Sequence, residues 1–280
     1  MRLVVLGSGF AVASEEARNT QLAVLGSEHG ILFDCGISPL DRFRRFRIDP
    51  ELIGDVVITH FHPDHAAGLS SFLMGLWLQG RKRPLTVHAS PPCLDRVEKL
   101  MELFEWRRWS GFYPLRFEAL PKAPGQIGFE NPEFVVRSAP VRHWIPAQAL
   151  RIESRTERAV VVYSSDTGPF EELVTLSGGA DLLLHEATGL ESGHSSAEQA
   201  GAIADQSGVK RLAHPLRPLG GPQGSPCPRS ANFLGSGGGR GGWDGAGALA
   251  GGGQITPINQ TGKKRLWYNP LGKGREKASR

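Results

Sequence analysis

The sequence predicts an α/β fold, because short apolar runs typical of buried strands alternate with stretches of helical periodicity. Residues 55–59, 159–163 and 180–184 are short runs rich in Val, Ile or Leu, as buried strands are. Residues 68–78 instead repeat apolar side chains at a spacing near 3.6 residues. The chain has 280 residues, of which 40% are hydrophobic, so it can form one large domain or two small ones with a sizeable core.

The positive net charge of +4 comes from the C-terminal part of the chain. From Ala213 onward, ten Lys and Arg face two Asp and Glu, which leaves 22 basic and 26 acidic residues before it. The body is therefore mildly acidic, and the whole-chain charge does not argue that the body binds nucleic acid. Cys35, Cys93 and Cys227 are too few and too scattered for a disulfide framework, which favours a reducing, cytoplasmic location.

The N-terminal residues predict a strand, a hairpin and a helix. The apolar run after Arg2 looks like part of a signal peptide, but glycines at positions 7 and 9 break it, and a strand followed by a turn explains the same residues. Two apolar runs, 21–25 and 31–33, flank a turn with two glycines and predict a β-hairpin. Residues 40–46 have an apolar stripe at helical spacing. No run approaches the ~18 apolar residues that cross a membrane, so no membrane contact is expected.

Three histidines and one aspartate follow the predicted strand 55–59 within six positions. His60 and His62 are separated by one residue, so an extended backbone directs both imidazoles to one side. Asp64 and His65 follow a proline that turns the chain. Imidazole and carboxylate suit zinc, and these are more ligands than one catalytic zinc normally takes from a single loop. The loop therefore predicts a two-metal site, with a histidine-rich surface loop as the alternative.

The spacing of this loop resembles the His-x-His-x-Asp-His signature of the metallo-β-lactamase superfamily. The resemblance implies a four-layer αββα sandwich, in which two mixed sheets pack face to face with helices outside. It implies a fold and a metal site and leaves the substrate open. Asp34 lies in an Asp-x-Gly sequence after the hairpin, which also matches the superfamily. We expect Asp34 to support a ligating histidine or a turn rather than to bind metal.

The next segments predict structural elements. Residues 68–78 predict a helix beneath the metal loop, residues 84–89 a strand, and residues 91–104 a helix that proline opens. Arg107 and Arg108 then lie among aromatic residues. Such a surface can stack bases and hold phosphates, but we favour a helix end with core aromatics and two arginines that extend to solvent.

The resemblance implies two further zinc ligands. His143 follows the predicted strand 134–138, and Asp166 follows the strand 159–163. In the superfamily these positions hold the third ligand of one zinc and the carboxylate that bridges both. Two zinc ions that share a water make hydroxide available at neutral pH, and Asp64, between the metals, is expected to orient it or accept its proton.

A proton donor for the leaving group is implied by two segments that follow. Residues 185–188, His-Glu-Ala-Thr, come directly after the strand 180–184, and residues 193–197 open a helix. They resemble the His-Glu-Ala-Thr and His-Ser-Thr motifs of the ribonuclease Z branch, in which the glutamate and the second histidine donate a proton to the leaving oxygen. By resemblance these roles fall to Glu186 and His194. A serine N-cap of the helix explains part of the second motif equally well.

The chain departs from this branch in two places. Members that process transfer RNA often carry a long arm between the third-ligand histidine and the bridging aspartate, whereas only 22 residues separate His143 from Asp166. The family also reaches its last ligand in a Thr-His pair after an apolar strand, but this chain continues with alanine, His214 and proline. His214 is the remaining candidate for that zinc ligand, about two residues early.

Residues 1–212 are expected to form the metallo-β-lactamase-like hydrolase domain. The segment 213–280 contains 17 of the 36 glycines and no sustained period, so it predicts a disordered tail. Reading the codons for 213–219 one base later permits Leu-Thr-His-Phe-Gly-Pro, which echoes residues 59–63. A frameshift that replaced the true C-terminus would explain this. The chain would then lack a zinc ligand and bind one zinc instead of two, with weak or absent activity.

The leading hypothesis is a two-zinc phosphodiesterase that resembles ribonuclease Z, an endoribonuclease of transfer RNA 3′ processing, and acts on RNA or a smaller diester. A hydrolase of a lactone, thioester or sulfate ester is the second class, but a carboxylate or thiolate needs less protonation than an alkoxide to leave. The third is non-enzymatic: an inactive product with a damaged C-terminus, or a chain whose basic tail binds nucleic acid. The oligomeric state stays open, with a homodimer among the alternatives.

Overall fold

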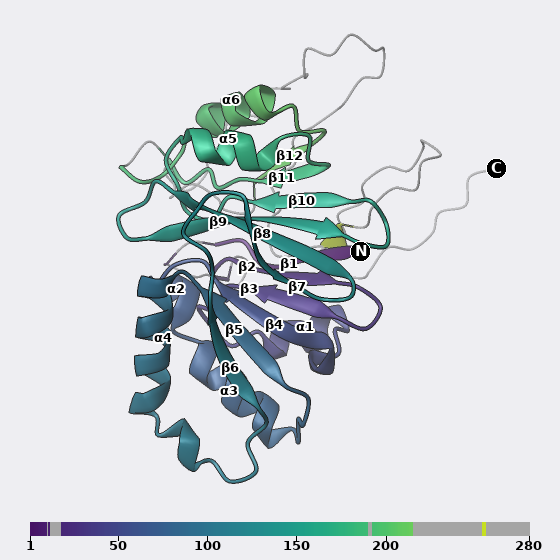
Figure 1. Ribbon diagram of the computed structural model, residues 1–280, viewed down its shortest axis with the longest axis vertical. Helices are drawn as coiled ribbons and strands as arrows, with labels where there is room; N and C mark the ends of the chain where they lie inside the picture. The colour runs from purple at the N-terminus through teal and green to yellow at the C-terminus, as the bar shows by residue number, and fades with distance from the viewer. Residues whose placement is uncertain (10, 12–17, 190–191, 215–253, 256–280) are drawn as a thin grey trace, which may run out of the picture.

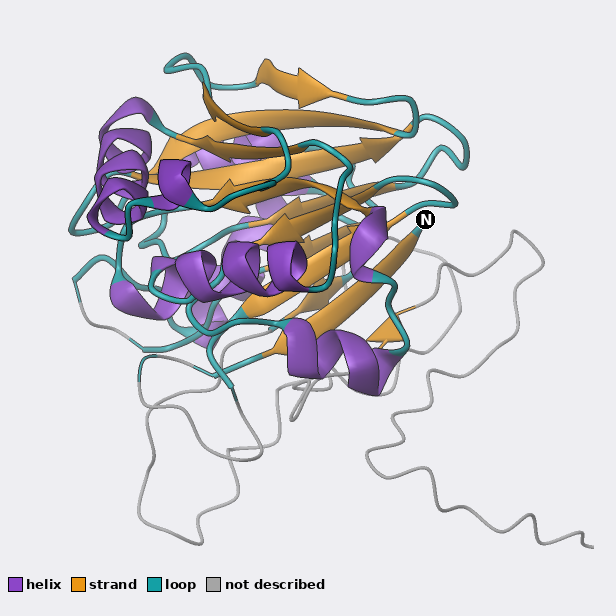
Figure 2. Ribbon diagram, turned by 90° about the horizontal axis from the view of Figure 1, so that it is seen from below, coloured by secondary structure: helices purple, strands orange, loops and turns teal. Residues whose placement is uncertain are grey.

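Two mixed β-sheets lie face to face in the computed structural model, and helices cover their outer sides (Figures 1 and 2). The structure describes residues 1–9, 11, 18–189, 192–214 and 254–255. Within these residues the first sheet has the strand order β13-β1-β2-β3-β4-β5-β6, and the second has the order β12-β11-β10-β9-β8-β7. The four-layer αββα arrangement expected from the sequence is confirmed.

The first sheet contains the predicted hairpin and the strand that leads into the metal loop. Its strands are β1 (Arg2–Gly7), β2 (Gln21–Leu25), β3 (Gly30–Phe33), β4 (Ile53–Ile58), β5 (Leu85–Ala89), β6 (Leu115–Ala119) and β13 (Gln254–Ile255). The β1-β2-β3 pairs are antiparallel, whereas β3 to β6 pair in parallel. All residues of β2 and β3 are buried, because layers cover both faces of these strands.

The second sheet combines an antiparallel meander with three parallel strands. Its strands are β7 (Gln126–Glu130), β8 (Phe134–Val141), β9 (Ala147–Ser154), β10 (Val160–Tyr163), β11 (Leu182–Leu184) and β12 (Leu212–Ala213). Strands β7 to β10 pair antiparallel in chain order, while β10, β11 and β12 run in parallel. Residues 213–280 were expected to be a disordered tail. The structure describes four of them, Ala213 and His214 at β12 and the two residues of β13, which pairs with β1, and the rest lie outside the described residues.

The helices form the two outer layers (Figure 1). They are α1 (Leu40–Phe46), α2 (Pro63–Ala66), α3 (Leu69–Leu78), α4 (Pro91–Leu103), α5 (Glu171–Ser177) and α6 (Ala197–Ser207), with single 3₁₀ turns at η1 (Pro50–Leu52) and η2 (Trp106–Arg108). Helix α6 begins with a capping box between Ser196 and Gln199 and ends at Gly208, whose φ of 62° favours glycine. Among the described residues, none of the helices combines the length and apolar character that a membrane span requires.

Three apolar clusters hold the four layers together. One lies beneath the first sheet and includes Phe43 of α1 and Phe72 of α3. The second lies between the sheets and joins residues such as Val57 of β4 and Leu150 of β9. The third packs α5 and α6 on the second sheet, through residues such as Ile203. Burial of apolar surface on both faces of each sheet therefore fixes how the two sheets sit against each other.

Several strand ends meet at one edge of the sandwich. The carbonyl oxygen of Thr59, just after β4, accepts a hydrogen bond from the backbone N–H of Gln148 in β9 at 3.1 Å. Within the second sheet, the backbone N–H of Ser164, just after β10, donates to the carbonyl oxygen of Leu184 in β11 at 2.9 Å. This edge thus brings the loop after β4 beside the segments that follow β8, β10 and β11.

Candidate active site

The metal loop begins at the carboxyl end of β4 and continues into α2. His60 is fully buried. His62 has an extended backbone (φ −80°, ψ 150°) and is the N-cap residue of α2, and Pro63 begins the helix. The change from extended to helical backbone turns His65 toward His60, so that their ring centroids lie 4.0 Å apart.

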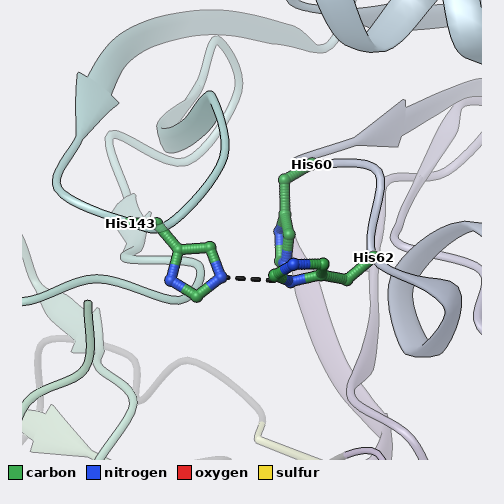
Figure 3. Close-up of side chains that lie close together, drawn as sticks. All are labelled: His60, His62 and His143. Atoms are coloured by element: carbon green, nitrogen blue, oxygen red, sulfur yellow. Dashed lines mark hydrogen bonds between the residues drawn. The ribbon is translucent and has the colours of Figure 1, made fainter. Parts of the chain in front are cut away.

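Side chains from the ends of β4, β8 and β10 and from the segment before α6 converge at this loop. Potential ligand atoms lie within 4.8 Å of one another in three groups: His60, His62 and His143; His60, His65 and Asp166; and His143, Asp166 and His194. Shared members join these groups, and we refer to the six residues as the His/Asp cluster. In Figure 3 the ring of His143, from the second sheet, faces His60 and His62 from the first. Nε2 of His143 lies 3.1 Å from Nδ1 of His62.

Two buried atoms of the His/Asp cluster fit a bound metal. Nε2 of His60 and Oδ1 of Asp166 have no hydrogen-bond partner within the described part of the chain. A buried polar atom without a partner costs about 1–3 kcal/mol, so native structures rarely leave one unpaired. A metal ion that binds both atoms would remove this cost, and imidazole with carboxylate is a donor set that zinc accepts.

Burial keeps most of the histidines in the form that binds metal. It lowers the pKa of His60 well below 6.5, and it also lowers the pKa values of His62 and His143. The neighbouring imidazoles strengthen this effect at His60, because each positive charge would repel the next. Neutral imidazole is the metal-binding form, so the site is prepared for a cation.

His65 differs because two carboxylates face it. Burial of His65 lowers its pKa, but the charges of Asp34 and Asp166 outweigh this and raise it well above 6.5. Asp166 is buried as well, yet His65 and His60 lower the pKa of its carboxyl group. Asp34 contacts His65 and lies outside the three groups of potential ligands among the described residues. The expected supporting position of Asp34 thus agrees with the geometry.

Glu186 and His194 are brought into direct contact. Glu186 follows β11 and is fully buried, and its Oε1 lies 2.9 Å from Nδ1 of His194. The same oxygen accepts hydrogen bonds from the backbone N–H groups of Thr167, at 3.0 Å, and Ser195, at 3.2 Å. Thr188 donates to the other oxygen through its N–H and its hydroxyl. These donors fix the carboxylate, which in turn holds His194 beside His143 and Asp166 of the cluster.

Two residues expected to bind metal, Asp64 and His214, are in none of the three groups of potential ligands among the described residues. Oδ2 of Asp64 is 3.6 Å from Nε2 of His65, which places Asp64 next to the cluster. His214 instead points Nδ1 at the carbonyl oxygen of His185, 3.0 Å away. It belongs to none of the three groups that the described residues form. The structure therefore does not bring His214 together with the other expected ligands.

Trp144 also contacts the His/Asp cluster, although no sequence motif singled it out. The residue is 59% exposed, although its indole stacks on His143 with ring centroids 5.4 Å apart. It also meets His194 edge to face at 5.2 Å. The available signal was its position directly after His143, in a turn between two strands.

The aromatic and arginine-rich segment around η2 packs as we favoured. Trp109 stacks on Trp77 of α3 at 5.5 Å, and both pack against the core beneath the first sheet. Arg107 and Arg108 are exposed and form ion pairs at 2.8 and 2.9 Å, the first with Glu102 of α4 and the second with Glu105, just before η2. The aromatic rings thus contribute to packing, and the arginine charges are locally balanced.

The fold and the site define the class of this protein: it belongs to the metallo-β-lactamase superfamily, and residues 29–214 match the family model described as a beta-lactamase superfamily domain. It is a hydrolase of that fold with His/Asp metal-binding clusters and is distantly related to ribonuclease Z. The ribonuclease Z of Methanothermobacter thermautotrophicus is 27% identical over 267 residues, which cover 76% of this chain and 85% of that protein. The ribonuclease Z of Ignicoccus hospitalis is 29% identical, and the match covers 75% of this chain and 86% of that protein.

Solved structures support the same fold. The short form of human tRNase Z superposes with a TM-score of 0.67 at 23% identity, covering 78% of this chain and 93% of that one. The metallo-beta-lactamase fold protein YhfI from Bacillus subtilis gives a TM-score of 0.63 at 20% identity, covering 79% and 87%. A diphosphatase from the PhnP family gives 0.59 at 18% identity, covering 77% and 86%. At these identities the likeness establishes the fold.

Proposed function

We propose that this chain is a two-zinc phosphodiesterase that resembles ribonuclease Z. The observation that carries the proposal is the contact of Glu186 with His194 beside His143 and Asp166. An alkoxide leaves a phosphodiester only with a proton, so this chemistry needs an acid beside the reacting centre. A thiolate leaving group has little such need, which disfavours a thioesterase. A lactone also expels an alkoxide, so the distinction expected from a lactonase does not hold and the assays below must include a lactone. The relatives named ribonuclease Z support the same choice.

Asp64 and five residues of the His/Asp cluster, all except His194, would hold the metal. The histidines His60, His62 and His143 would hold one zinc. Asp64 and His65 would hold the other, with Asp166 as the remaining carboxylate. When bound, the two zinc ions would supply hydroxide at neutral pH and offset negative charge on the phosphoryl oxygens. Asp64, 3.6 Å from His65, would orient the attacking group or take up its proton.

The acid is His194, and Glu186 positions it. Glu186 accepts two backbone hydrogen bonds on the oxygen that contacts Nδ1 of His194, so neither the carboxylate nor the ring is free to turn. A ring held at Nδ1 gives up the proton on Nε2 to the leaving oxygen. General acid catalysis of this kind contributes about 10²–10⁴-fold to the rate.

The substrate is either precursor transfer RNA bound without an arm or a smaller diester. Between His143 and Asp166 the chain forms β9, β10 and the short turns next to them. These take up the whole interval, so no arm extends from it. Structures with this fold include both a tRNase Z and a diphosphatase, which keeps both substrate classes in the proposal.

The test compares two diesters that differ in leaving group. The zinc-loaded protein and the His194→Ala variant would be assayed with bis(p-nitrophenyl) phosphate and with an RNA dinucleotide. The p-nitrophenolate is stable without a proton, so we expect its release to fall only a few-fold in the variant. Release of the nucleoside alkoxide should fall by about 10²–10⁴-fold.

The control for this assay replaces a histidine far from the His/Asp cluster in the sequence. His29→Ala removes a histidine from the β2–β3 turn and should change neither rate. An equal loss with both diesters would show that His194 does not act as the acid. Hydrolysis of a lactone or thioester without diester cleavage would replace the proposal with the second class. Precursor transfer RNA, added to the same assays, separates the two substrate classes.

A further inference from the structure

Trp144 exposes a large apolar surface directly at the reacting centre. It lies in the turn between β8 and β9, next to His143, and 59% of the residue is exposed. Fully burying an aromatic side chain stabilises a protein by a large margin, so exposure of an indole beside a polar site is not explained by core packing. The exposed surface is available to a ligand.

The indole is held in a fixed place. It stacks nearly parallel on His143, with an interplanar angle of 19°, and it meets His194 at 89° and His62 at 68°. Gly193 closes the remaining side, because a Cβ at that position would lie 2.9 Å from Cδ1 of Trp144. The φ of Gly193 is +81°, which also favours glycine. The absence of a side chain at Gly193 therefore gives the indole the space that it occupies.

We propose that Trp144 is a stacking platform for a nucleobase of the substrate. The inference rests on the proposed phosphodiesterase function and narrows its substrate class to nucleotide esters. Flat aromatic rings stack on bases of any sequence, and a ring that is already held in place loses little conformational entropy on binding. Since Trp144 contacts both His143 and His194, a base on its exposed face would lie next to the diester that these residues surround.

The kinetic test uses two substrates with the same leaving group. Thymidine 5′-(p-nitrophenyl phosphate) carries a base, and methyl p-nitrophenyl phosphate does not. We expect wild type to prefer the thymidine ester in kcat/KM, with the preference expressed mainly in KM. Trp144→Leu should reduce that preference about tenfold, or about 1.4 kcal/mol. Trp144→Phe retains an aromatic ring and should keep most of it.

Unchanged preference in Trp144→Leu would overturn the proposal. An equal loss with both esters in Trp144→Leu would overturn it too, because Trp144 would then only support His143. A shift confined to the thymidine ester supports the platform.

A binding measurement makes the result independent of catalysis. Adenosine 5′-monophosphate should quench tryptophan fluorescence of the wild type more than ribose 5-phosphate does, and this difference should disappear in Trp144→Phe. Five other tryptophans remain in that variant as an internal reference. If no diester is cleaved, the proposed function fails, while the quenching difference still supports the platform when present and overturns it when absent.

Discussion

Oδ2 of Asp34 lies 2.8 Å from Nδ1 of His65, and both side chains are buried. The other oxygen of Asp34 accepts a hydrogen bond from the backbone N–H of Thr59 at 2.8 Å, directly before His60. The hydroxyl of Tyr163, at the end of β10, donates to Asp34 at 3.1 Å. One carboxylate thus ties both halves of the metal loop to the second sheet, and it leaves Nε2 of His65 to face Asp166 at 3.5 Å.

Removing this carboxylate should weaken zinc binding. In Asp34→Ala we expect the affinity for zinc to fall about 10- to 100-fold, because a histidine without its partner loses orientation and basicity. Competition with a chelating dye measures the change. Asp55→Ala is the matched control, since Asp55 contacts His88 at 2.9 Å in the same way but outside the three groups of potential ligands. Equal affinities for zinc in the two variants would contradict the assignment.

Gly36 should be essential for the position of Asp64. A Cβ on Gly36 would lie 1.8 Å from the backbone carbonyl oxygen of Asp64, so the loop must move if alanine is introduced. Gly36→Ala is expected to lower zinc content and to cost about 1–3 kcal/mol of unfolding free energy. Gly54→Ala in β4 provides the control, because among the described residues none except its chain neighbours has an atom within 4 Å of the added Cβ. Denaturant unfolding with metal analysis measures both, and equal effects would refute the explanation.

Zinc content should depend on His60 and not on His214. Nδ1 of His214 lies 3.0 Å from the carbonyl oxygen of His185, and His214 is in none of the three groups of potential ligands. Nε2 of His60 is instead buried in the cluster without a hydrogen-bond partner among the described residues. We therefore expect His214→Ala to retain the zinc content of the wild type and His60→Ala to lose metal. Atomic emission on dialysed protein gives the ratio. Loss of one zinc in His214→Ala would show that His214 is a zinc ligand.

Stability should depend on pH through Glu133. Burial of Glu133 raises its pKa, but hydrogen bonds from Glu28, Ser27 and His29 outweigh this and lower it from 4.5 to about 2. Because the folded pKa is depressed, the stabilisation is fully present above about pH 4.5 and disappears as the pH falls toward 2. Glu133→Gln should therefore cost about 1.5–3 kcal/mol at pH 7 and progressively less below pH 4.5.

Urea unfolding at several pH values measures the difference between Glu133→Gln and the wild type. Glu130→Gln is the control, since Glu130 is exposed in its ion pair with Arg155 and should change stability by less than about 1 kcal/mol. A stability difference at Glu133 that stays constant between pH 7 and 2.5 would show that its charge is not the cause.

The sequence predicted the elements well where the periodicity was local. The hairpin, α1, α3, β5 and α4 were expected within one or two residues of their observed bounds, because apolar alternation and proline positions act over a single element. The order of motifs also led to the four-layer fold by resemblance. The predicted domain boundary at residue 212 falls inside a strand, since β12 spans Leu212–Ala213. Strand β13, from the predicted tail, also pairs with β1 of the first sheet.

By itself, the sequence determined that His60, His62, Asp64 and His65 share one loop, because six consecutive positions after a strand cannot lie far apart. Only the tertiary structure decided which distant residues join them. His143 lies 81 residues from His62, and their rings meet because the two sheets bury a common apolar core and bring the ends of their strands to one edge. The same packing leaves His214 against His185 and exposes Trp144 beside the cluster, and no local pattern carries that information.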